Sequence, residues 1–269
     1  MLALTQRLLR AAEGGEPVVL AALLEAGQAA LTPGSRLIIE RDGGRMGTLG
    51  DAALDDVVAA HAAAAFERHA VETLYVTESG LSSRTVAGAT SIYLEVVEAK
   101  PVFLVVGGGH IGRALAQLAA MLNFHVAVLD DRAEYADPAR FPEADEVIKE
   151  DYELALDRFP IGPNTSVVMV TRGHRQDEVA LRHSLGRGAG YIGMIGSRRR
   201  TSTVLEHLRE EGFDPEELAK VRTPIGLDIG AETPEEIAIS IMGEVILLRR
   251  GGTGRPMYHR RGQGPSPRE

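Results

Sequence analysis

The stretch 102–132, which reads VFLVVGGGHIGRALAQLAAMLNFHVAVLDDR, constrains the fold of this chain more than any other. An apolar run meets closely spaced glycines, an apolar-periodic segment follows, and a second apolar run ends in two aspartates. This order predicts a strand, a tight turn, a helix and a second strand. Gly107, Gly109 and Gly112 have the G-x-G-x-x-G spacing of a dinucleotide-binding turn, so the stretch predicts a Rossmann unit.

Each glycine has its own task in such a turn. Gly107 would allow the sharp bend, Gly109 would let a pyrophosphate approach the backbone, and Gly112 would let the helix pack closely on the strand. The phosphate would lie at the helix N-terminus, beside His110 and Ile111. Unpaired N–H groups and the helix dipole favour an anion at that place.

Acidic residues after the second strand predict the contact with a ribose. Asp130 stands where a Rossmann unit places the carboxylate that accepts a hydrogen bond from a ribose hydroxyl. Asp131 adds a second negative charge, which disfavours the 2′-phosphate of NADP, although Arg132 offsets part of it. We therefore expect NAD, or another nucleotide with a plain 2′-hydroxyl, in preference to NADP.

Two later strands, expected at 166–171 and 191–195, also end in polar loops. Ligands of open parallel sheets bind outside the carboxyl ends of the strands, so these loops would join the glycine turn around one crevice. The first loop carries Thr171, Arg172, His174 and Asp177. His174 and Asp177 could act as an acid/base pair. They have no third group at metal-ligand spacing, so we expect no metal site.

The second loop, Gly196 and Ser197 before Arg198, predicts a second anion site. Arg199 and Arg200 fit either this anion site or a solvated first turn of the following helix. Asp228, in the apolar loop 226–230, is a further candidate whose burial would raise its pKa. The predicted cofactor-binding residues are Gly107, Gly109, His110, Ile111, Gly112, Asp130, Asp131, Arg132, Thr171, Arg172, Gly196, Ser197, Arg198 and Asp228, and the predicted catalytic residues are His174 and Asp177.

The segment before the Rossmann signature reads as a smaller α/β domain over 1–98. An amphipathic helix opens it, 18–24 fits a strand or a buried helix, and strands are expected at 35–40, 46–49, 74–77 and 91–97. A helix is expected from Ala53, and the turn at 42–44 predicts a hairpin. The Rossmann-like, doubly wound parallel sheet is expected over 101–250. Residues 251–269, rich in glycine, proline and arginine, predict a disordered tail.

Charge and composition exclude several classes of protein. The net charge of −9 argues against a general nucleic-acid binder. No apolar run approaches the length of a membrane span, and no secretion signal is visible, so we expect a cytoplasmic protein. The chain has no cysteine, which excludes disulfides, thiolate metal sites and a cysteine nucleophile.

Four segments, in their order, resemble the xanthine dehydrogenase accessory proteins of the XdhC/CoxI family: GGGHIGRALAQLAAMLNFHVAVLDDR, TRGHRQD, YIGMIGSRRR and PIGLDIGAETPEEIAISIMGE. The resemblance implies an N-terminal family domain followed by a Rossmann domain. It also implies a protein that binds molybdenum cofactor and assists its sulfuration with a cysteine desulfurase. The clients would be xanthine dehydrogenase or carbon-monoxide dehydrogenase enzymes.

The N-terminal segment departs from the family pattern at its cysteines. Where the family commonly has G-T-x-G-G-G-C-L-E, residues 47–55 read GTLGDAALD, and Ala53 stands in place of the cysteine. A second pattern, V-C-G-G, appears as VAGA at 86–89, with Ala87 in place of the thiol. Arg172 takes a position that is often histidine. Any thiol chemistry of the family is therefore absent from this chain.

Three functions remain open from the sequence. The first is a maturation factor that holds a pyranopterin, or its dinucleotide form, and delivers it to a molybdenum hydroxylase. The second is an NAD-dependent oxidoreductase in which His174 and Asp177 transfer protons. The third is a regulatory nucleotide-binding module without chemistry. The sequence also leaves open whether the chain forms a homodimer.

Overall fold

The computed structural model describes residues 2–27, 30–77 and 80–260, apart from the side chains of His174, His259 and Arg260. The chain divides into two compact units, one of Met1–Lys100 with Arg249–Gly251 and one of Pro101–Leu248 with Gly252–Glu269. Each unit has a hydrophobic core of its own.

The N-terminal unit is an antiparallel sheet of order β3-β2-β1-β6-β4-β5 with one helix packed on each face. Its elements are α1 (Leu2–Ala12), β1 (Val18–Glu25), β2 (Arg36–Glu40), β3 (Arg45–Thr48), α2 (Ala52–Arg68), β4 (Val71–Thr77), β5 (Gly80–Ser82) and β6 (Thr90–Val97). The segment that fitted either a strand or a buried helix is the strand β1, which pairs with both β2 and β6. The short strand β5 lies between the strands expected at 74–77 and 91–97, in a stretch where the sequence predicts no strand.

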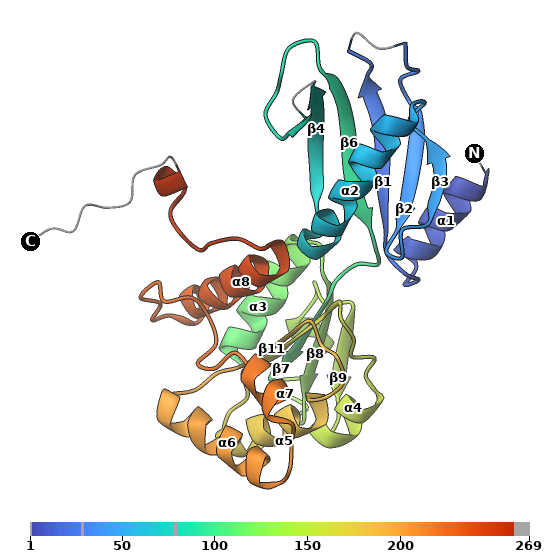
Figure 1. Ribbon diagram of the computed structural model, residues 1–269. Coiled ribbons are helices and arrows are strands. Elements are labelled where there is room, and N and C mark those ends of the chain that lie inside the picture. The colour runs from blue at the N-terminus through green and yellow to red at the C-terminus, as the bar shows by residue number, and fades with distance from the viewer. Residues whose placement is uncertain (1, 28–29, 78–79, 261–269) are drawn as a thin grey trace, which may run out of the picture. The chain divides into compact units, whose positions relative to one another are not determined.

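Local sequence explains where α2 begins and ends. The Asp51 side chain accepts a hydrogen bond from the Leu54 N–H at 2.8 Å and caps the first turn. His69 ends the helix in the left-handed conformation, with φ of 47°. Figure 1 shows α2 lying along the sheet of this unit, where its apolar side packs on β1, β2 and β6.

The C-terminal unit is a doubly wound sheet of parallel strands in the order β11-β10-β7-β8-β9. This is the order of the first five strands of a Rossmann sheet, and it confirms the predicted fold class. The elements are β7 (Val102–Val106), α3 (His110–Met121), β8 (His125–Asp130), the 3₁₀ turn Pro138–Arg140, β9 (Glu146–Lys149), α4 (Tyr152–Arg158), β10 (Thr165–Met169), α5 (His174–Ser184), β11 (Tyr191–Met194), α6 (Arg198–Glu210), α7 (Pro215–Lys220) and α8 (Pro234–Arg250).

Helices cover both faces of this sheet (Figure 1). Apolar side chains of α3 and α8 pack on one face, and those of α4, α5, α6 and α7 pack on the other. The first three strands follow one another outward from β7 to β9. The chain then returns to β10, which pairs with the other edge of β7, so the strand order changes direction between β7 and β10. The carboxyl ends of these two strands therefore border the crevice where such sheets bind ligands.

Two local hydrogen bonds fix the start of the last helix. Thr233 Oγ1 accepts a hydrogen bond from the Glu236 N–H at 3.2 Å, and the Glu236 carboxylate accepts one from the Thr233 N–H at 3.0 Å. This reciprocal pair is a capping box, and α8 begins at Pro234. The helix α7 was not expected. Of the predicted disordered tail, residues 251–260 are described and include the 3₁₀ turn Met257–Arg260, whereas 261–269 lie outside the described residues.

Candidate functional site

The three motif glycines meet three different steric demands at the end of β7. Gly107 has φ of 115°, and a Cβ atom there would lie 2.6 Å from the Val170 carbonyl oxygen. A Cβ at Gly112 would lie 1.9 Å from the Gly107 oxygen, so α3 sits directly against the turn. A Cβ at Gly109 would meet no atom within 4 Å. The first and third glycines are therefore needed by the fold, while the space in front of the second is open.

Gly108, which the motif leaves unassigned, is as constrained as its neighbours. A Cβ there would lie 2.0 Å from the Tyr135 carbonyl oxygen. Its N–H donates to Asp130 Oδ2 at 2.8 Å. In the sequence, the one indication of this role is that Gly108 lies within a run of three glycines.

Asp130 ends β8, as the motif predicts, but its carboxylate is already occupied by groups of the chain itself. Its side chain has no exposed surface, and Oδ1 and Oδ2 accept from Arg132 Nε and Nη2, each at 2.9 Å. The Arg132 N–H also donates to Oδ1 at 3.0 Å. Together with the bond from Gly108, these contacts occupy the carboxylate, so Asp130 and Arg132 fasten the turn to the end of β8.

Asp131 is the carboxylate of this loop that remains partly accessible. Its Oδ2 accepts a hydrogen bond from Arg172 Nη2 at 3.2 Å, which links the loop after β8 to the loop after β10. Its Oδ1 is buried and receives no hydrogen bond from the described part of the chain. Arg132 Nε, 3.7 Å from this oxygen, is beyond hydrogen-bond distance. The hydrogen-bonding capacity of this oxygen is thus unused by the described residues.

The loop after β10 is closed by Asp177. The Asp177 side chain is 4% exposed, and its Oδ1 accepts from the Thr171 hydroxyl at 2.7 Å and from the Thr171 N–H at 3.2 Å. These bonds hold the turn that leads into α5. His174 opens α5, but its side chain lies outside the described residues.

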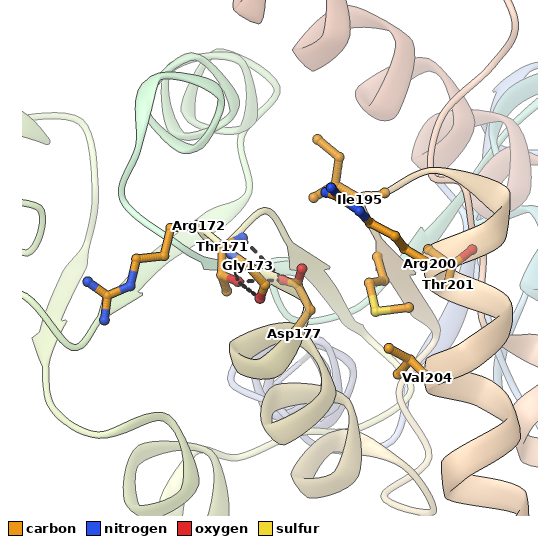
Figure 2. A pocket seen from close by; sticks show the side chains of 10 residues that line it. Thr171, Arg172, Gly173, Asp177, Ile195, Arg200, Thr201 and Val204 are labelled. Carbon is orange, nitrogen blue, oxygen red and sulfur yellow. Dashed lines mark hydrogen bonds between the residues drawn. The ribbon is translucent and has the colours of Figure 1, made fainter.

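A pocket of about 220 Å³ lies beside this loop, between the ends of β10 and β11 (Figure 2). Thr171, Arg172, Gly173 and Asp177 line one part of it, and Met194, Ile195, Gly196, Arg200, Thr201 and Val204 line the rest. Of the predicted anion loop, Gly196 reaches the pocket, while Ser197 and Arg198 are exposed and do not line it. Arg200, for which the sequence left both the anion site and a solvated turn open, is the arginine of this run that lines the pocket.

Comparison with known proteins decides the family. The model of the XdhC Rossmann domain matches residues 103–245, more than half of the 269 residues, and the model of the XdhC and CoxI family matches residues 11–76. The chain belongs to the XdhC and CoxI family. No helix in the described part of this family member has the length and apolar character that a membrane crossing needs.

Three curated relatives are similar in sequence to parts of this XdhC/CoxI protein. It is 30% identical over 225 residues to the uncharacterized protein YqeB of Escherichia coli, covering 82% of this chain and 41% of YqeB. It is 34% identical over 161 residues to a Bacillus subtilis protein named as a probable xanthine dehydrogenase subunit, covering 60% of this chain and 47% of that protein. It is 27% identical over 89 residues to the molybdenum cofactor insertion chaperone PaoD of E. coli, covering 33% of this chain and 28% of PaoD. The chain spans less than half the length of each relative.

A solved structure shares the fold of this XdhC/CoxI chain. A crystal structure described as a xanthine dehydrogenase from Bacillus halodurans superposes with a TM-score of 0.53 and 22% identity, covering 97% of each chain. At this identity the likeness shows the fold alone.

The remaining predicted residues of this XdhC/CoxI protein lie away from the pocket. His110 is exposed at the start of α3, and Ile111 packs half-buried between α3 and the sheet. Asp228 is exposed in the loop before α8, so the burial expected from the sequence is not present. Among the residues that the structure describes, no group of three metal-ligating side chains gathers.

Glu244 on α8 has a structural role that no pattern in the sequence indicated. Its carboxylate accepts from the Tyr191 hydroxyl at 2.6 Å and from the Gly226 N–H at 3.0 Å. Burial and the neighbouring Glu244 carboxylate raise the pKa of Tyr191, which keeps the hydroxyl protonated as a donor. Glu244 therefore ties β11 and the loop before α8 to α8 in the XdhC Rossmann domain.

In the N-terminal domain of this XdhC/CoxI protein, Ala53 lies beside a second pocket. This pocket, of about 550 Å³, is lined by Ala30, Leu31, Gly50, Asp51, Ala53, Leu54, Val57, Val76 and Thr90. Ala53 occupies the first turn of α2, where the family pattern has a cysteine. The wall of this pocket is mostly apolar and offers no thiol.

Acid should destabilise the XdhC Rossmann domain through Asp130. Burial alone would raise the pKa of Asp130, but the hydrogen bonds from Arg132 and Gly108 outweigh it and hold this pKa below its ordinary value of 3.8. Because the folded state has the lower pKa, the carboxylate stabilises the fold above about pH 4, and this contribution is lost as the pH falls through the folded-state value.

Urea unfolding between pH 7 and pH 3 measures this effect. The free energy of unfolding should fall with acid more steeply in the wild type than in Asp130→Asn, which lacks the titrating group. Equal slopes in the two proteins would rule out Asp130 as a source of the acid sensitivity.

Proposed function

We propose that this chain is an accessory protein that binds a pyrophosphate-containing form of molybdopterin at the glycine turn and delivers it to a molybdenum hydroxylase. The observation that carries the proposal is the open backbone at Gly109, at the N-terminus of α3. No side-chain group caps this helix, so its first N–H groups and its dipole are free for a phosphate.

The loop after β8 would bind the sugar next to that phosphate. Asp131 Oδ1 is buried without a hydrogen-bond donor from the described residues, and a ribose hydroxyl would supply one. A buried polar atom without a partner is costly, so this bond would favour binding. The carboxylate also repels a 2′-phosphate, which is why we expect NADP to bind poorly.

Similarity to named proteins supports the direction of the proposal. One relative is named as a molybdenum cofactor insertion chaperone and another as a probable xanthine dehydrogenase subunit. A protein of this kind would bind the cofactor, shield it and release it to a client enzyme. The chemistry at the metal belongs to the cofactor and the client, while this chain's residues bind and orient the ligand.

The absence of cysteine limits the role. Without a thiol, this chain can neither accept sulfur from a cysteine desulfurase nor ligate molybdenum through sulfur. If a desulfurase takes part in the pathway, its sulfur must reach the cofactor directly. The proposed role is therefore holding and transfer of the cofactor.

An NAD-dependent activity is the second candidate, favoured by the strand order and by the acidic loop after β8. The position of Asp177 argues against it. This carboxylate is buried and bonded to the Thr171 backbone and hydroxyl, so it holds a turn and is poorly placed to carry protons. NAD binding without catalysis would correspond to a regulatory module.

Titration calorimetry of the full chain with NAD, NADP and the dinucleotide form of molybdopterin separates these functions. We expect the molybdopterin form to bind most tightly and NADP most weakly. The loaded protein should also activate a cofactor-free molybdenum hydroxylase when the two are mixed, whereas the unloaded protein should not. Tight NAD binding without any molybdopterin binding would refute the maturation role.

A further inference from the structure

We propose that the pocket between the ends of β10 and β11 is a phosphate subsite in which Arg200 binds the anion. The pocket is separate from the open backbone at Gly109, and none of the comparisons assigns it a ligand. The subsite stands on its own geometry. Only its connection to a ligand on the glycine turn rests on the proposed function.

Arg200 is the cation available in this pocket. Its guanidinium has no hydrogen bond or ion pair to any residue that the structure describes. Figure 2 shows the Arg200 side chain running from α6 past Ile195, whereas the Arg172 side chain points out of the pocket. Arg172 instead contacts Asp131. An unpaired guanidinium at the rim of a cavity offers up to five donors to an oxyanion.

The surroundings of Arg200 suit an anion attached to an organic group. Thr201, which is buried, lines the same wall, and its hydroxyl donates to the carbonyl oxygens of Ser197 and Arg198. Gly196 lies just before α6, and its φ of 150° turns the chain into the first turn of that helix. Met194, Ile195 and Val204 make the floor apolar. This combination fits a phosphate that is joined to a carbon skeleton.

One carboxylate opposes an anion in the pocket, namely Asp177. Its Oδ1 is engaged by the Thr171 N–H and hydroxyl. These bonds draw its charge toward the turn, on the α5 side of the pocket, while Arg200 comes from α6. The subsite is therefore expected next to α6.

The pocket also adjoins the glycine turn. A Cβ at Gly107 would lie 3.0 Å from the Thr171 Cα, and Thr171 lines the pocket. An elongated ligand on the turn could thus place its far end at Arg200.

Binding of inorganic phosphate to the full chain tests the subsite. Titration calorimetry at constant ionic strength, with chloride replaced by phosphate, should give saturable binding. Arg200→Gln should weaken it by about tenfold, the loss expected for one charge-assisted hydrogen-bonding group. Arg200→Lys should recover part of the affinity. Arg199→Gln, in the same helical turn but outside the pocket, should change it by less than about twofold.

Three results would overturn the subsite: no saturable phosphate binding to the wild type, equal losses in Arg199→Gln and Arg200→Gln, or loss in Gly109→Val with none in Arg200→Gln. The last result would place the phosphate on the glycine turn, and would support that part of the proposed function while removing the subsite. Circular dichroism of each variant confirms that it is folded, which we expect because both arginines are exposed.

Discussion

A Gly109→Val variant should fold normally and lose cofactor binding by roughly a hundredfold, or about 2.8 kcal/mol. The backbone at Gly109 is extended, with φ of −69° and ψ of −166°, a conformation that valine adopts without strain. No atom lies within 4 Å of the position of the new Cβ. The side chain would therefore fill only the space that we assign to the pyrophosphate.

Titration calorimetry and thermal unfolding of the same preparation test this variant. The Tm should stay within a few degrees of the wild-type value while the heat of ligand binding disappears. Gly109→Ala, with a smaller side chain, should lose less affinity. Molybdopterin binding that is unchanged in Gly109→Val would mean that the turn is not the cofactor site.

The opposite outcome is expected three residues along the helix, at Gly112. A Cβ there would lie 1.9 Å from the Gly107 carbonyl oxygen and 3.2 Å from Val105 Cγ1. Neither backbone nor core can yield without moving α3 away from β7. Gly112→Val should cost more than about 3 kcal/mol of the unfolding free energy of the Rossmann unit.

Urea unfolding followed by circular dichroism measures the loss. Because the N-terminal unit has its own core, part of the ellipticity should survive after the Rossmann unit has unfolded. Gly162, whose added Cβ would meet no atom within 4 Å, provides the matched control. A Gly112→Val protein as stable as Gly162→Val would show that α3 is not held against the turn as described.

Patterns with a strong local cause were predictable from the sequence. The apolar run, the glycine spacing and the second strand specify β7, α3 and β8, because each part imposes a separate geometric demand. The capping box of α8 is likewise local, since Thr233 and Glu236 are three residues apart. The short elements β5 and α7 lack such periodicity, and only their tertiary setting stabilises them.

The side-chain roles at the site depended on contacts that no spacing reveals. Asp130 and Asp131 are equivalent in sequence, yet Arg132 and the Gly108 N–H occupy only the first. In the same way, nothing in a run of three arginines tells which one faces a cavity. The helix direction at α6, set by its packing against α5 and α7, makes Arg200 that residue.

The contacts of Glu244 have a mechanical consequence for the loop before α8. Gly226, before the exposed loop residue Ile229, is bonded to Glu244, and Thr233, after it, is bonded to Glu236. Both anchors belong to α8, so loop and helix form one closed ring of covalent and hydrogen bonds. A partner that bound Ile229 would therefore exert force on α8, whose apolar side chains pack with those of β7 and β10. Force applied at this surface would thus reach the sheet without passing through a hinge.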